Sequence, residues 1–151
     1  MKLTLSMACA MLLVATGAFA QTAPPFALAK CDPEAVAPIT FNNVQLTRDV
    51  LANGQRLAAG TYQVRITSER PTPAAGQSPM GECWVEFLKS GNLAGREVAS
   101  VISAEDIAST VNGPAPKPNM TRVDVLKGGE YLRVWINQGG THYIVNLPLV
   151  R

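Results

Sequence analysis

Few residues of this chain have the side chains and the spacing that catalysis requires. The sequence holds a single histidine, His142, directly after a glycine pair and one threonine. A Ser–His–Asp or Cys–His arrangement would need His142 as its base, and no G-x-S-x-G nucleophile motif is present. A blue-copper site takes two histidines and a cysteine, so its ordinary form is excluded. We therefore predict that His142 is exposed at a strand end, opposite Asn137, without a catalytic role.

Three glutamates on neighbouring predicted strands are the remaining candidates for acid–base chemistry. Glu82, Glu86 and Glu97 could form the carboxylate pair that hydrolyses glycosidic bonds. Carboxylates interleaved with arginines on strands more often form solvated cross-strand pairs. A small hydrolase is therefore the least favoured function, and we predict a protein that is not an enzyme and has no cofactor.

Cys31 and Cys83 are the two cysteines outside the N-terminal apolar segment. In an oxidising compartment such a pair usually forms a disulfide, which would stabilise the domain by on the order of 4 kcal/mol. The alternative is two buried thiols. With one histidine and two cysteines, no set of three metal ligands is evident, so we predict no metal site.

The N-terminal residues have the pattern of a secretory signal peptide. Residues 1–20 contain one early lysine, an apolar run and the ending Ala18-Phe19-Ala20. Residues 21–35, rich in alanine and proline, are expected to form an extended lead-in. The protein is therefore predicted to be exported, to the periplasm or the extracellular space, without a transmembrane segment.

The charge pattern argues against nucleic acid as a partner. The formal net charge of the whole chain is +2, and acidic and basic residues are interleaved without a basic run. No glycine-rich phosphate-binding loop precedes a helix, so nucleotide binding is also disfavoured.

The last thirty or so residues have the most regular pattern in the chain. Three apolar-alternating runs between Thr121 and Leu149 are separated by Gly128-Gly129 and Gly139-Gly140, which is typical of a three-stranded antiparallel meander. A three-residue loop at 138–140 would mix polar and apolar side chains on each face, whereas two-residue turns keep one face apolar. We predict the two-residue turns, with a core face of Leu132, Val134, Ile136, Val145 and Leu147.

The opposite face of this meander carries the candidate binding residues. In the same register Arg122 lies opposite Trp135, Asp124 lies opposite Arg133, and Tyr131 points to the same side. Such cross-strand pairs each contribute a few tenths to about 1 kcal/mol. This face is either a surface of flat-lying amphipathic side chains, a face partly covered by a loop, or a platform for a ligand or partner. The candidates are Arg122, Tyr131, Arg133 and Trp135.

The preceding part of the chain is predicted to form short strands. These are 37–46, bulged near Asn42-Asn43, a hairpin of 49–51 and 55–57, then 61–67, 82–89 and 93–103. A turn at Gly91-Asn92 would place Glu86 opposite Glu97, which is unfavourable unless Gly95 forms a bulge, so that register stays open.

A capping-box spacing from Ser103 to Asp106 predicts a helix of one or two turns, which the proline-rich residues 112–118 end. Together these elements predict one all-β domain at residues 36–151. It is a single antiparallel β-sandwich or a partly open barrel of about eight strands, with at most one short helix.

The segment from Gly54 to Ile66, G-Q-R-L-A-A-G-T-Y-Q-V-R-I, resembles the G-x-x-L-P-A-G-T-Y segment of several uncharacterised secreted bacterial β-domain proteins. Ala58 stands where those proteins often carry proline. The resemblance implies an exported β-sandwich in which a glycine-containing turn delivers a buried Tyr62 into a strand. It implies no functional residue.

These observations favour an exported, non-enzymatic module that binds a partner or contributes to an envelope or surface assembly. The alternative is a carbohydrate-binding module that stacks a sugar ring on exposed Trp135 and Tyr131. The expected partner is an unknown protein or glycan. Exposed sheet edges also allow homo-oligomers to form by strand pairing.

Overall fold

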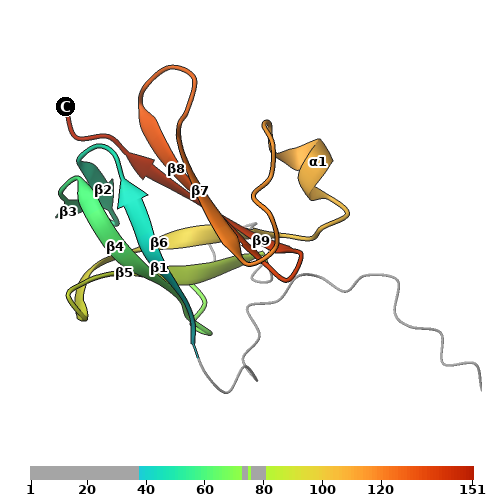
Figure 1. The fold of residues 1–151 in the computed structure, drawn as a ribbon, viewed down its shortest axis with the longest axis horizontal. Helices are drawn as coiled ribbons and strands as arrows, with labels where there is room; N and C mark the ends of the chain where they lie inside the picture. Colours follow the sequence, from blue (N-terminus) through green and yellow to red (C-terminus); the bar gives the residue numbers. More distant parts are fainter. Residues whose placement is uncertain (1–37, 73–74, 76–80) are drawn as a thin grey trace, which may run out of the picture.

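The computed structural model describes residues 38–72, 75 and 81–151, and the described chain is all-β. One antiparallel sheet of seven strands, in the order β1-β4-β5-β6-β9-β8-β7, curls until it is nearly closed into a barrel (Figure 1). The all-β prediction is confirmed. Of the two architectures that the sequence left open, the structure has the partly open barrel.

Nine strands and one helical turn make up the described chain. The barrel sheet contains β1 (Ile39–Leu46), β4 (Gly60–Ile66), β5 (Glu82–Lys89), β6 (Asn92–Ile102), β7 (Met120–Val125), β8 (Tyr131–Gln138) and β9 (Thr141–Pro148). A separate hairpin of β2 (Val50–Ala52) and β3 (Gln55–Leu57) packs Val50, Ala52 and Leu57 into the barrel core. The single helix, α1 (Ile107–Thr110), lies outside the barrel next to β8 and β9 (Figure 1).

The core follows from the two-residue period of the strands, because alternate side chains point to the same face. Tyr62, Val64 and Ile66 of β4 are buried, as the sequence predicts. All five residues predicted for the core face of the meander are fully buried. The meander thus forms one wall of the barrel core.

Tyr62, in the segment from Gly54 to Ile66 that carries the sequence resemblance, has contacts that explain why a tyrosine is placed there. The Tyr62 ring is buried and packs edge-on against Phe87, at 6.4 Å between ring centroids. Its hydroxyl donates a hydrogen bond to the Ala58 carbonyl at 2.8 Å. The tyrosine therefore joins the turn before β4 to the core.

The register of the β5–β6 hairpin, which the sequence left open, is not that of a turn at Gly91-Asn92. The turn is formed by Ser90 and Gly91, since Lys89 pairs with Asn92. Leu88 pairs with Leu93 while Phe87 pairs with Gly95, so Ala94 is the extra residue of a bulge. The turn position and the bulge together place Glu86 opposite Arg96 instead of Glu97, which replaces a repulsive pair with an attractive one.

Several predictions concern residues outside the described part. The signal peptide at 1–20, the lead-in at 21–35 and Cys31 all lie there, as do residues 73–74 and 76–80 of the long loop before β5. Cys83 is fully buried on β5, and its disulfide with Cys31 stays a prediction. No helix in the described ranges has the length and hydropathy needed to cross a membrane.

Candidate functional site

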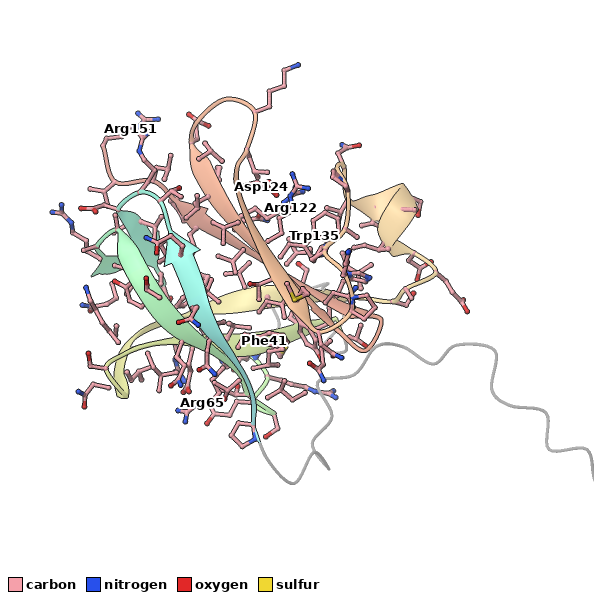
Figure 2. All side chains as sticks on the ribbon, viewed as in Figure 1. Phe41, Arg65, Arg122, Asp124, Trp135 and Arg151 are labelled. Atoms are coloured by element: carbon pink, nitrogen blue, oxygen red, sulfur yellow. The ribbon has the colours of Figure 1, made fainter. Side chains whose placement is uncertain are left out.

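The meander has the predicted register on both of its faces. Arg122 lies opposite Trp135 and Asp124 opposite Arg133 on β7 and β8. On β8 and β9, Val134 lies opposite Val145, as two-residue turns at both glycine pairs require. Positive φ angles at all four turn glycines explain why these turns take glycine. The register therefore brings three of the four candidate residues close together, and Figure 2 shows Arg122, Asp124 and Trp135 on the side of β7–β8 that faces α1.

This face is partly covered by a loop segment, which is one of the three alternatives that the sequence left open, and Trp135 is therefore not an exposed aromatic platform. Trp135 is 1% exposed and Arg133 is 8% exposed. The cover is the segment of residues 103–119 between β6 and β7, here named the strap. Ile107 of α1 packs with Trp135 and Ile144 in a second, smaller core, to which Ile102 and Val111 add. A sugar ring therefore has no access to stack on Trp135 in this structure.

The proline-rich half of the strap is held by side chains that donate to every second backbone carbonyl. Arg133 Nη1 donates to Asn112 O at 2.9 Å, and Arg122 Nη1 donates to Pro114 O at 3.2 Å. Asn137 Nδ2 donates to Pro116 O at 2.8 Å. Proline has no N–H and favours extended backbone, so this strand-like segment attaches mainly through its carbonyls, and at its end the Asn119 N–H donates to Asn137 O at 2.7 Å.

Asp124 neutralises the two arginines beneath the strap. Its carboxylate accepts from Arg122 Nε at 2.7 and 2.9 Å and from Arg133 Nη2 at 3.0 Å. Partial burial alone would raise the pKa of Asp124, but the hydrogen bonds and charges of Arg122 and Arg133 outweigh it and hold that pKa below its ordinary value of 3.8. The carboxylate is therefore ionised wherever the protein is folded near neutral pH.

Arg133, rather than Arg122 on the opposite strand, makes a cation–π contact with Trp135. Its guanidinium carbon lies 4.8 Å from the ring centroid. Arg122 instead turns back along its own strand to Asp124, two residues away. The Arg133 Nε is buried and has no hydrogen-bond partner among the described residues. Arg122, Asp124 and Arg133, here named the clamp, therefore hold the strap against the meander.

His142 is buried beneath the strap, which corrects the prediction that it is exposed. It is 3% exposed and lies opposite Asn137, as expected from the register. Its Nδ1 accepts a hydrogen bond from Trp135 Nε1 at 3.0 Å, so the neutral ring carries its proton on Nε2. Burial lowers the pKa of His142 from its ordinary value of 6.5.

We expect the stability of the protein to fall as the pH decreases from 7.5 to 5.5. The unfolded chain binds a proton at His142 near pH 6.5, whereas the folded chain resists protonation until a lower pH. The stabilisation is therefore complete above pH 6.5 and is lost as the pH falls through the folded pKa. Urea unfolding followed by Trp135 fluorescence, in a Trp84→Phe background, measures this change.

A His142→Gln variant is the control for this experiment, because His142 is the only histidine in the chain. Its free energy of unfolding should vary much less over the same pH interval. An equal pH dependence in the variant would show that another group is responsible.

Tyr131 does not belong to the clamp, although it shares the face of β8. It is 42% exposed and lies opposite Pro148, near the β7–β8 turn. Arg122, with a side chain 39% exposed, is the other candidate that solvent reaches. The four predicted residues therefore divide into a buried pair and two accessible side chains.

None of the three glutamates considered for hydrolysis lies opposite another: Glu82 pairs with Ser100, and Glu86 and Glu97 face different sides of the sheet. Glu97 lies opposite Val85, whereas Glu86 is one position further along and faces the other side of the sheet. Glu86 accepts from Arg65 Nε at 2.7 Å, and Glu97 accepts from the backbone N–H of Asn53 at 2.5 Å. The turn position and the bulge at Ala94 together cause this separation, since they shift the register by one residue.

A groove at the barrel seam is the feature that sequence reasoning missed. It lies where the sheet edges β1 and β7 face each other, and its volume is about 700 Å³. No ladder joins these two strands in the described sheet. The lining consists of four carboxamides, two threonines and two apolar side chains: Asn42, Asn43, Asn119, Gln138, Thr40, Thr121, Phe41 and Met120. We name this feature the seam groove.

Left-handed asparagines shape both walls of the seam groove. Four described non-glycine residues have positive φ, and Asn53 and Ser90 among them lie in hairpin turns. The other two are Asn43 (φ 59°), in the bulge of β1, and Asn119 (φ 61°), directly before β7. Non-glycine residues in this conformation are uncommon and concentrate at turns and functional sites. The predicted break at Asn42-Asn43 was the sequence signal for one wall.

Part of the lining is already oriented by hydrogen bonds. Asn42 Oδ1 accepts from Gln63 Nε2 at 2.7 Å, and Asn119 Oδ1 accepts from the Gly139 N–H at 3.2 Å. Both therefore have an amino group left to donate. Asn43 and Gln138 make no side-chain hydrogen bond with any described residue. The seam groove thus presents fixed donors together with carboxamides that are unpaired within the described chain.

Within the described ranges, no three histidine, cysteine, aspartate or glutamate side chains gather as a metal site. Comparison with known proteins found no matching family model, no similar curated protein and no similar solved structure. Function is therefore argued from the residues alone.

Proposed function

We propose that this protein is an exported, non-enzymatic binding module whose ligand site is the seam groove. The signal-peptide pattern of residues 1–20 supports export. The groove supports binding, because its size is that of a typical ligand site and its polar groups converge from two sheet edges. Of the four candidates on the meander face, Arg133 and Trp135 are covered by the strap, whereas Arg122 and Tyr131 stay accessible.

The groove is well placed for binding because the barrel holds its walls rigidly. Val44 and Leu46 of β1 are buried in the barrel core, and β7 is paired along its length with β8. Backbone that strand pairing already holds in place does not have to be ordered when a ligand binds, which favours affinity. The observation that carries the proposal is this concave, amide-rich seam on a fixed scaffold.

The test is capture of native envelope or extracellular material by the immobilised full chain. The groove variant combines Asn43→Gly with Gln138→Ala, since glycine keeps the positive φ at position 43. We expect this variant to capture about a tenth or less of the ligand that the parent chain captures, as the loss of two or more hydrogen bonds predicts. The control is Asn92→Ala at the β5–β6 turn, which should capture as much as the parent chain. Equal capture by all three proteins would contradict the proposed site.

A structural role in an envelope or surface assembly is the second candidate, favoured by the two open edges of the barrel sheet. β1 and β7 each have one side without a strand partner in the described sheet. Such edges pair readily with other chains. If copies assemble in this way with help from the lead-in, deletion of residues 21–35 should shift the elution of the protein toward the monomer on size-exclusion chromatography. Unchanged elution would count against this role.

A further inference from the structure

We infer that the seam groove binds a neutral oligosaccharide. This inference rests on the proposed binding function and specifies its ligand class. None of the described residues that line the groove is charged. A charged ligand would gain no ion pair from this lining, and it would lose hydration on entering the groove.

The polar groups of the groove match sugar hydroxyls. A hydroxyl both donates and accepts a hydrogen bond, and a carboxamide offers two donors and an acceptor. Asn42 and Asn119 are fixed through their oxygens and present N–H donors, while Asn43 and Gln138 retain both functions within the described chain. One carboxamide can therefore bind two neighbouring hydroxyls of one ring.

The apolar part of the lining matches the C–H face of a sugar. Phe41 is partly buried against the core and lines the groove from β1, and Met120 is exposed on β7. An aromatic ring and a polarisable thioether both pack well against apolar faces of irregular shape. Apolar contacts from β1 and β7, together with the carboxamides of the same lining, suit a ring that is polar at its rim and apolar on its faces.

An inserted peptide strand fits this groove less well. A strand paired to both β1 and β7 would need them about 9.5 Å apart, which is twice the spacing between neighbouring strands. Some Cα atoms of β1 and β7 lie within 8 Å of each other. The bulge between Phe41 and Val44 also interrupts the regular row of donors and acceptors on β1.

The test is isothermal titration of the full chain with hexasaccharides of glucose in α and β linkage, of mannose and of N-acetylglucosamine, and with polygalacturonate as the charged comparison. We expect saturable binding of at least one neutral hexasaccharide and no binding of polygalacturonate. The Asn43→Gly/Gln138→Ala variant should bind that hexasaccharide about tenfold more weakly or worse. Asn92→Ala should bind with unchanged affinity, and the thermal midpoint of each variant reports its folding.

Failure of this inference is distinguishable from failure of the proposed function. Absence of binding to every neutral hexasaccharide, or binding that the groove variant leaves unchanged, overturns the oligosaccharide inference. If the groove variant nevertheless loses the capture of a protein from the envelope, the groove is a binding site for a different class of ligand. If no capture depends on the groove, the binding proposal fails as well.

Discussion

Replacing Trp135 with alanine should lower the free energy of unfolding by about 3–5 kcal/mol, because it empties the centre of the second core. The indole is 1% exposed and packs against Ile107 and Ile144 under the strap. The same substitution removes the cation–π contact with Arg133 and the hydrogen bond to His142. Urea denaturation followed by far-ultraviolet circular dichroism measures the loss.

Trp84→Ala is the matched control, since Trp84 is the only other tryptophan and also stacks with an arginine, Arg96, at 4.4 Å from the ring centroid. Trp84 is only partly buried on β5, so its loss should cost clearly less than that of Trp135. Equal losses for the two variants would contradict the second core as a source of stability. Proteolysis within the strap should also increase for Trp135→Ala alone, because the strap then has no apolar site to cover.

Asp124→Ala should destabilise the protein by about 2–3 kcal/mol, the range expected when a partly buried charged group loses its hydrogen bonds and one buried arginine loses its partner. Arg133, whose side chain is 9% exposed, would keep its charge beneath the strap without the carboxylate that now lies 3.0 Å from its Nη2. Arg122 would lose its ion partner at the same time. The free energy of unfolding at pH 7 measures this effect.

Two further variants show whether an unpaired buried charge is the cause. Glu130→Gln breaks the exposed ion pair with Arg151 and should change stability by no more than about 0.5 kcal/mol. Adding Arg133→Met to Asp124→Ala removes the unpaired charge, so the double variant should recover part of the loss. If the double variant is less stable than Asp124→Ala, the packing of Arg133 matters more than its charge.

The meander was predictable from sequence because its register has a local cause. Glycine pairs at 128–129 and 139–140 define the turns, and a side-chain period of two leaves one register with an apolar face. The core face from Leu132 to Leu147 follows directly. The bulge at Asn42-Asn43 was also predictable, since two adjacent asparagines interrupt an otherwise alternating strand.

The β5–β6 register was not predictable to one residue, because two turn positions around Gly91 are both compatible with the local sequence. In the structure β6 pairs with both β5 and β9, and its hairpin has the turn at Ser90-Gly91 with a bulge at Ala94. The moved turn and the bulge together separate Glu86 from Glu97 and remove the carboxylate pair that the sequence offered for hydrolysis.

The exposed or buried state of the outer meander face depends on tertiary structure alone. Sequence alternation places Arg133 and Trp135 on one face, but it does not show that a segment ending at residue 119 returns across that face. The capping residues and prolines of the strap predict its local conformation, but the hydrogen bonds that hold it go to backbone carbonyls, which every residue has, so no sequence pattern shows where it docks.

The seam groove also depends on tertiary structure. Asn43 and Gln138 come together only when the barrel curls and leaves β1 and β7 facing each other. The sequence by itself therefore determined the strands, the turns of the meander and the core face, all of which depend on neighbours close in the chain. The tertiary structure decided which surface is covered and which is open, because that depends on contacts between distant segments.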